Sequence, residues 1–162
     1  MSVRKFAAIA IAASVAFGAT GCTFMTPIAT QRAYQPGNGT NADLGSSLNG
    51  VAARNFVYLV NDSGQGALIG TLINQGDTDA TVTITPAAGK ATSVAVAAGK
   101  TVDFGYNGAA ALDLGITAKA GSLASIELAS GSDKAMLGVE VLDGTFSEYA
   151  GLIPAGPTPA KN

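Results

Sequence analysis

The side chains able to do chemistry are few in this sequence, and the rarest of them is a single cysteine. Cys22 is the only thiol among 162 residues, and histidine is absent. One cysteine excludes an internal disulfide and a zinc site built from cysteines. Without histidine, the commonest general base and transition-metal ligand are missing, and a Ser-His-Asp triad is impossible. We therefore predict no catalytic residues, no metal site, no cofactor and no enzyme activity.

Two pairs of acidic residues are the remaining candidates for chemistry. Asp77 and Asp79 offer two oxygens to a cation, whereas calcium takes about six to eight oxygen ligands. Asp143 and Glu148 could form a carboxylate pair of the glycosidase kind. Both pairs lie in turn-rich stretches, where solvated surface carboxylates are the favoured interpretation.

The N-terminal segment has the pattern of a secretory signal peptide. Arg4 and Lys5 precede an apolar run, Phe6–Ala19, which is too short for a membrane-spanning helix. The run ends in Ala19-Thr20-Gly21-Cys22, which resembles the lipobox of bacterial lipoproteins, with Ala19 where leucine is commoner. A plain secretory signal followed by a chance cysteine is the alternative.

The lipobox resemblance implies a lipid anchor at Cys22. It implies cleavage between Gly21 and Cys22, one lipid group with two acyl chains attached through the sulfur, and acylation of the new amine. Two or more acyl chains anchor a protein stably. We therefore expect the protein on the extracytoplasmic face of a bacterial cell membrane, held there through its lipid.

Composition divides the chain into four parts. Residues 1–21 form the predicted signal peptide, 22–49 the lipidated cysteine and a flexible tether, 50–153 a folded domain, and 154–162 a disordered Pro/Ala tail. The formal net charge is −2 and becomes more negative when Arg4 and Lys5 are removed. An acidic domain has no electrostatic reason to bind nucleic acid.

Alternation of apolar and polar residues dominates the predicted domain. Val139 and Val141 flank Glu140, and Val82 and Ile84 alternate with threonines such as Thr83. A period of two indicates half-buried strands. It places Val139 in the core and Thr83 on the outer face.

Two runs, Phe56–Val60 and Leu68–Ile73, are apolar on both faces and suit central strands. Leu112, Leu114 and Ile116 also alternate, although Gly108–Leu114 could form a helical turn instead. About seven or eight short strands between turn-forming residues predict an all-β fold, an antiparallel β-sandwich of the immunoglobulin or cupredoxin kind.

A short motif, Leu72-Ile73-Asn74-Gln75-Gly76-Asp77, is similar to the opening of the periplasmic copper-chaperone family of cupredoxin-like sandwiches. The resemblance covers roughly residues 34–143, and small actinobacterial lipoproteins share this plan. That family binds copper through histidine and methionine, including a late His-x-Met pair. This sequence has no histidine, and its methionines after the signal peptide are Met25 and Met136. The copper site therefore cannot be carried over to any residue here.

The aromatic residues give the last candidates for binding. Phe56 and Phe104 suit the core, whereas Tyr106 and Tyr149 lie near predicted loops and could form a binding surface. We predict a non-catalytic, lipid-anchored binding module that contacts another cell-envelope protein or a wall component. The alternative is a copper or small-ligand carrier of the copper-chaperone type.

Overall fold

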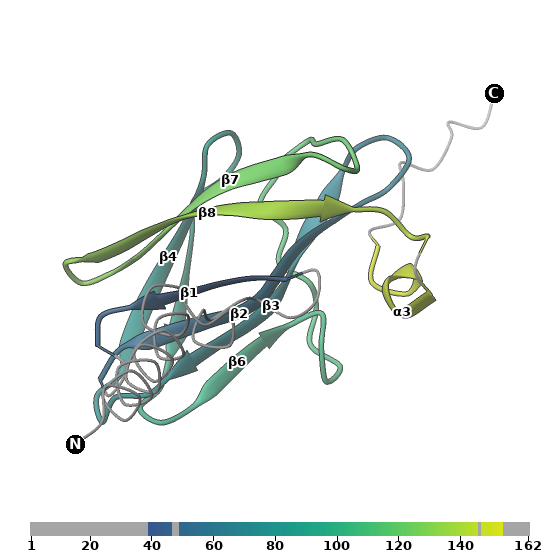
Figure 1. Ribbon diagram of the computed structural model, residues 1–162. Coiled ribbons are helices and arrows are strands. Elements are labelled where there is room, and N and C mark those ends of the chain that lie inside the picture. The colour runs from purple at the N-terminus through teal and green to yellow at the C-terminus, as the bar shows by residue number, and fades with distance from the viewer. Residues whose placement is uncertain (1–38, 47–48, 146, 154–162) are drawn as a thin grey trace, which may run out of the picture. The chain divides into compact units, whose positions relative to one another are not determined.

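A computed structural model describes residues 39–46, 49–145 and 147–153 (Figure 1). The predicted signal peptide, Cys22, most of the predicted tether and the predicted tail lie outside these residues. Within them the chain forms eight strands and one short helix, α3 (Ser147–Ala150), which confirms the prediction of an all-β fold. The strands are β1 (Thr40–Leu44), β2 (Val51–Val60), β3 (Gly66–Asn74), β4 (Ala80–Pro86), β5 (Thr92–Val96), β6 (Thr101–Phe104), β7 (Leu123–Ser130) and β8 (Asp133–Leu142).

The strands join into one mixed, nearly closed, barrel-like sheet. Its strand order is β5-β4-β7-β8-β2-β3-β6, and β1 pairs with β2 beside this path. Every pair is antiparallel except β2 and β8, which run parallel at Val57–Leu59. The prediction of a purely antiparallel arrangement is therefore wrong at this pair. No hairpin fixes the direction of β2 against β8, because β3 to β7 lie between them in the chain.

Strand β1 lies within the predicted tether, residues 22–49, so regular structure begins before the predicted domain boundary at residue 50. Arg54 of β2 holds β1 by donating hydrogen bonds to the Asp43 carboxylate at 2.6 Å and to the Ala42 carbonyl at 3.0 Å. The Thr40 hydroxyl donates to the Gly138 carbonyl of β8 at 3.0 Å. Strand β1 is therefore an integral part of the domain.

A bulge divides β2 into two halves that serve different neighbours. Its first half pairs with β1 and its second with β8, and the register against β3 shifts between Arg54 and Val57. Asn55 takes a positive φ of 54° at this point. Gly70 of β3 lies opposite this register shift. A Cβ atom at Gly70 would collide with the Phe56 ring. Only a residue without a side chain fits there.

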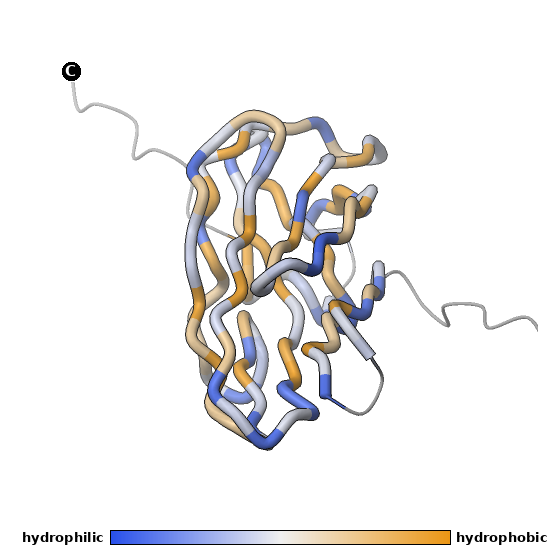
Figure 2. Tube along the Cα trace, turned by 90° about the vertical axis from the view of Figure 1, so that its left-hand side faces the viewer, coloured by the Kyte–Doolittle hydropathy of each residue, from blue (hydrophilic) through white to orange (hydrophobic). Residues whose placement is uncertain are grey.

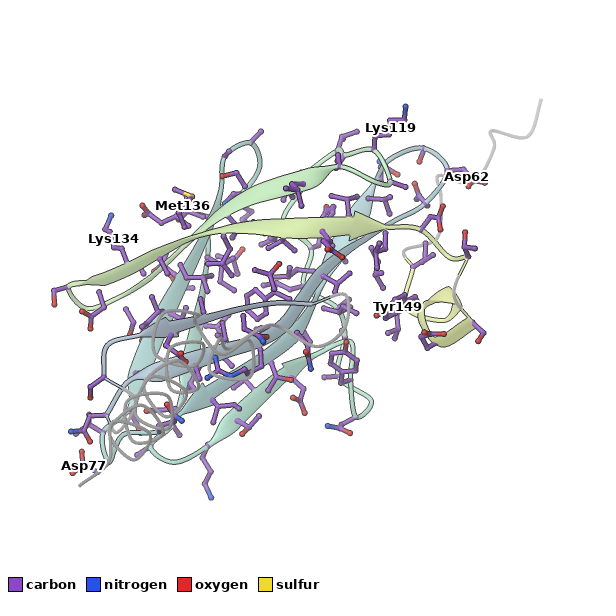
Figure 3. All side chains as sticks on the ribbon, viewed as in Figure 1. Asp62, Asp77, Lys119, Lys134, Met136 and Tyr149 are labelled. Carbon is purple, nitrogen blue, oxygen red and sulfur yellow. The ribbon has the colours of Figure 1, made fainter. Side chains whose placement is uncertain are left out.

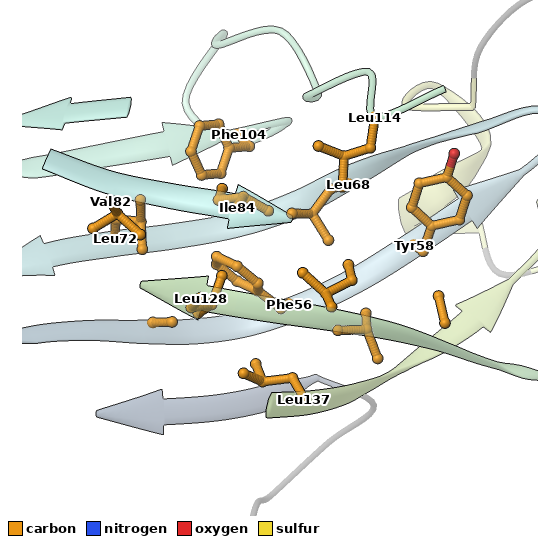
Figure 4. Packing of buried hydrophobic residues seen from close by; sticks show 14 of the residues in the cluster. Phe56, Tyr58, Leu68, Leu72, Val82, Ile84, Phe104, Leu114, Leu128 and Leu137 are labelled. Carbon is orange, nitrogen blue, oxygen red and sulfur yellow. The ribbon is translucent and has the colours of Figure 1, made fainter. Parts of the chain in front are cut away.

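The core lies inside the barrel, where ten of its residues are labelled in Figure 4. Apolar segments alternate with paler ones along the strands in Figure 2. Val82, Ile84 and Val139 are fully buried, whereas Thr83 is partly exposed. The predicted register of these strands is therefore confirmed.

Residues 105–122 form neither the predicted strand nor the predicted helical turn. Leu112 bridges Leu68 of β3 through two backbone hydrogen bonds of 2.8 Å, and Leu114 is fully buried. The Asp113 carboxylate accepts the Gly115 N–H at 2.8 Å, and Gly115 has a φ of +61°. This local turn prevents a continuous ladder, so the leucines enter the core from a loop.

Candidate functional site

The structure places Tyr106 and Tyr149 against the outer side of β2 and β3. Here Val57, Leu59 and Ile69 form a second buried cluster, which we call the covered face. The residues packed over it are half-buried and come from the loop after β6, the end of β8 and the C-terminal segment: Tyr106, Ala111, Leu142, Tyr149, Leu152 and Ile153.

The two tyrosines are therefore packing residues of the covered face. Burial, with a smaller contribution from the neighbouring Tyr149, raises the pKa of Tyr106. Tyr149 belongs to α3 and is labelled in Figure 3. The expected binding role of the two side chains stays a prediction. The residues packed over the covered face explain why β2 and β3 are apolar on both faces, because each face of these strands contacts other residues of the chain.

The outer side of β7 and β8 has a different character. Among the described residues, the large apolar side chains that stand out in water are Leu123, 69% exposed, and Met136, 68% exposed. They lie on neighbouring strands with Ser125 and Gly138 between them, because Ser125 pairs with Gly138. We call these four residues the β7–β8 patch. Figure 3 shows Met136 pointing away from the core.

The β7–β8 patch is continuous. The Ser125 hydroxyl lies 3.4 Å from the Met136 sulfur. A Leu123 methyl carbon lies 3.6 Å from the position that a Cβ atom of Gly138 would take. Gly138 therefore contributes no side chain between Leu123 and Met136, and its backbone is exposed between these two large apolar side chains.

Charged groups border the patch on two sides. Lys134 Nζ lies 3.1 Å from Glu127 Oε1 beside Met136. Exposed Glu140 pairs across the strands with Leu123. Beyond β7 the outer face continues over β4 and β5, whose sequences carry no charge. Sequence reasoning missed this patch, although Met136 and Leu123 each stand where alternation calls for a polar residue.

A pocket of about 510 Å³ opens at one end of the barrel, lined by Gln65, Ala67, Asp113, Thr117 and Leu152 among others. Beneath it, the Tyr58 hydroxyl lies 2.8 Å from both the Gly66 and Ile116 carbonyls. Burial raises the pKa of Tyr58 to about 12. These contacts fix β2 to the start of β3 and to the loop at Ile116, so the groups beneath the pocket are engaged in holding the fold.

One carboxylate of each acidic pair considered from sequence accepts a hydrogen bond from a backbone N–H. Asp143 accepts the Thr145 N–H at 3.0 Å, and hydrogen bonds from Thr145 lower the Asp143 pKa. Asp79 accepts the Ala98 N–H at 2.9 Å. Across the described part of the chain, no three acidic, histidine or cysteine side chains gather as metal ligands.

Asn74, from the motif on which the predicted copper-chaperone resemblance rests, has a structural role. Its buried amide donates to the Thr78 carbonyl at 2.8 Å and the Val96 carbonyl at 3.0 Å, and it accepts the Gly76 N–H at 3.0 Å. The side chain thereby joins the end of β3 to the end of β5.

Comparison with known proteins gives no identification. No protein family matches the sequence, and no curated protein matches it either. The resemblance to the copper-chaperone family therefore stays a prediction. Within the described residues, no helix is long and apolar enough to cross a bilayer.

Proposed function

We propose that this protein is a non-catalytic lipoprotein, anchored through Cys22 on the extracytoplasmic face of a bacterial membrane, that binds another envelope protein. The lipobox-like Ala19-Thr20-Gly21-Cys22 supports the anchor. The observation that carries the binding role is the β7–β8 patch, with two large apolar side chains more than two-thirds exposed.

The chemistry of the patch indicates what the partner presents. Burying a leucine or methionine side chain is worth roughly 1.5–3 kcal/mol. A partner side chain seated over Gly138 would contact Leu123 and Met136 together. Exposed Glu140, which lies opposite Leu123, favours a basic group next to that apolar side chain. We therefore propose an envelope protein that inserts an apolar side chain flanked by lysine or arginine.

We also propose that the barrel-like sheet belongs to the immunoglobulin or cupredoxin class of sandwiches. The strand order supports two layers, β6-β3-β2 and β5-β4-β7-β8. Strand β2 joins them, since its second half pairs with β8 on one edge and β3 on the other. The bulge at Asn55 lets one strand serve both layers.

The binding role is tested by recovering complexes after chemical cross-linking of intact cells. Leu123→Asp or Met136→Asp should remove the same partner band, because an apolar contact would then desolvate a charge. Thr83→Asp, on the outer face of β4, is the matched control and should keep it. A band that survives both patch substitutions contradicts the proposed surface.

The anchor is tested separately by metabolic labelling with a fatty acid. Cys22→Ser should abolish the label and leave an uncleaved precursor or a released protein. A Cys22→Ser chain that is processed normally and stays in the membrane would show that the lipoprotein interpretation is wrong.

A further inference from the structure

The pocket at the end of the barrel opens where the loop between β6 and β7 separates from β3. Two isolated bridges join these segments, Gln65 with Thr117 and Leu68 with Leu112. Between the bridges β3 contributes two residues, whereas the loop contributes four. The extra loop residues bow away from β3 and leave a pocket of about 510 Å³. Small-molecule sites have volumes of roughly 300–1,000 Å³.

The loop that forms one wall of this pocket is held in place by the rest of the domain. The Leu114 side chain is fully buried, and the Leu114 carbonyl accepts the Lys90 N–H at 2.7 Å. The Ala118 N–H donates to the Gly64 carbonyl at 2.9 Å. The wall is therefore formed before any ligand arrives, and a ligand would not have to order it.

The hydrogen bonds beneath the pocket leave one acceptor without a donor from the phenol. The Tyr58 hydroxyl lies 2.8 Å from the Gly66 carbonyl and 2.8 Å from the Ile116 carbonyl. Both carbonyls belong to residues that line the pocket. A tyrosine hydroxyl carries a single hydrogen, so it donates to only one of the two carbonyls at a time. A ligand with N–H groups could supply the donor that the other carbonyl lacks.

The charge of the pocket is negative. Among the described residues that line it, Asp113 is the only one with a charged side chain. Asp113 Oδ1 accepts the Gly115 N–H at 2.8 Å, whereas a carboxylate can accept about four hydrogen bonds. The Asp113 charge also contributes to the raised pKa of Tyr58, so this carboxylate acts on the hydroxyl beneath the pocket. The pocket thus combines a negative charge with spare acceptor capacity.

We propose that this pocket binds a small primary amine in its ammonium form. The ammonium group has three N–H donors, which suit the Asp113 carboxylate and the carbonyl that receives no hydrogen from Tyr58. The apolar part of the ligand packs against Ala67, Ala111 and Leu152. An anion would be repelled by Asp113, and a purely apolar molecule would leave the acceptors unpaired.

The expected affinity is modest and depends on salt. Asp113 is exposed, so water and ions screen its attraction for the ammonium. None of the described lining residues belongs to the β7–β8 patch, so this site is additional to the proposed protein-binding surface.

Heteronuclear NMR of the isotope-labelled full chain with Cys22→Ser tests the ligand class. Phenethylamine, titrated at neutral pH, should cause saturable shifts in the amide signals of Gly115 and Thr117. Phenethyl alcohol, which has the same apolar part without the charge, should bind several-fold more weakly. Equal binding of the two probes, or no saturable shift at these amides, would overturn the proposal.

Asp113→Asn tests the recognising group. Asparagine keeps an oxygen for the Gly115 N–H but loses the charge, so phenethylamine should bind several-fold more weakly. Asp62→Asn, at an exposed carboxylate outside this pocket, is the matched control and should change nothing. Thermal unfolding of both variants confirms that the fold is kept. An Asp113→Asn chain that binds phenethylamine like the parent chain would contradict the site.

A peptide lysine is the alternative source of an ammonium group. Lysine acetylated at its α-amine and amidated at its carboxyl end is the probe for it. Binding of this probe at Gly115 and Thr117, without binding of phenethylamine, would show that a protein segment occupies the pocket and would overturn the proposal. These titrations contain no partner protein, so their results are independent of the β7–β8 patch.

Discussion

The covered face and the β7–β8 patch are two outer surfaces of one sheet, and both carry large apolar side chains. On the covered face Val57, Leu59 and Ile69 are at most 1% exposed, because a later segment of the same chain packs over them. On the patch Leu123 and Met136 are 69% and 68% exposed. Apolar residues that face outward therefore stabilise the fold in one place and remain available to a partner in the other.

The largest expected effect comes from placing the same charge on each surface. Leu59→Asp would bury an unpaired carboxylate and should cost several kcal/mol or prevent folding. Met136→Asp leaves its charge in water and should change the free energy of unfolding by less than about 0.5 kcal/mol. Urea denaturation of both variants measures the difference. Equal decreases in the free energy of unfolding would contradict the distinction between the two surfaces.

The register of the inner and outer sides gives a second large effect. Val139→Asp should be severely destabilising, because Val139 is fully buried in the core. Thr83→Asp should be mild, because Thr83 is partly exposed on the outer face. Thermal unfolding compares the two, and similar melting temperatures would show that the assignment of faces is wrong.

A smaller effect is expected from trimming each surface. Tyr149→Ala should cost about 1–2 kcal/mol, less than a fully buried aromatic, and should speed hydrogen exchange in β2 and β3. Leu123→Ala should leave both the unfolding free energy and the exchange rates unchanged. Exchange measured by mass spectrometry checks this. Unaltered exchange in the Tyr149→Ala variant would show that Tyr149, packed over the covered face, does not stabilise β2 and β3.

Alkaline pH should weaken the fold through its buried phenols. Burial raises the Tyr58 pKa to about 12 and also raises the Tyr106 pKa. A raised pKa means that the folded state holds the proton more tightly than the unfolded state. This stabilisation is complete below pH 10 and is lost as the pH rises towards 12. Tyr106→Phe should reduce the pH dependence of urea unfolding above pH 10, and an unchanged slope would contradict this assignment.

The smallest expected effect is on copper. Tight Cu(I) binding needs several soft or imidazole ligands, and the sequence contains no histidine. Met136 is an isolated, exposed thioether whose sulfur meets the Ser125 hydroxyl. The folded domain should therefore take no Cu(I) from bicinchoninate. Stoichiometric transfer that is lost in Met136→Leu would favour the carrier function instead.

The all-β fold and the inner faces of its strands follow from local alternation, which is a property of neighbouring residues. Strand β1 was missed because it is held by Arg54 and by Gly138, which are distant in sequence. The parallel pairing of β2 with β8 was missed for the same reason. Leu112 to Ile116 alternate like a strand, but the turn at Asp113 and Gly115 prevents a ladder.

The candidate surfaces also could not be predicted from local alternation alone. Tyr106 and Tyr149 were singled out because they lie near loops, yet the fold packs them on the covered face. Leu123 and Met136 interrupt the alternation of β7 and β8, and that interruption was the available signal. Alternation shows which side chains point away from the core. Only the folded structure shows which of these side chains are covered by other segments of the same chain.

Site-specific photocross-linking in intact cells tests the central claim most directly. A photoreactive amino acid at position 136 should give one discrete adduct with another envelope protein, and Leu123→Asp in the same chain should abolish it. The same probe at position 83, on the outer face of β4, should give no such adduct. No adduct at position 136, or an equal one at position 83, would contradict the β7–β8 patch as the binding surface.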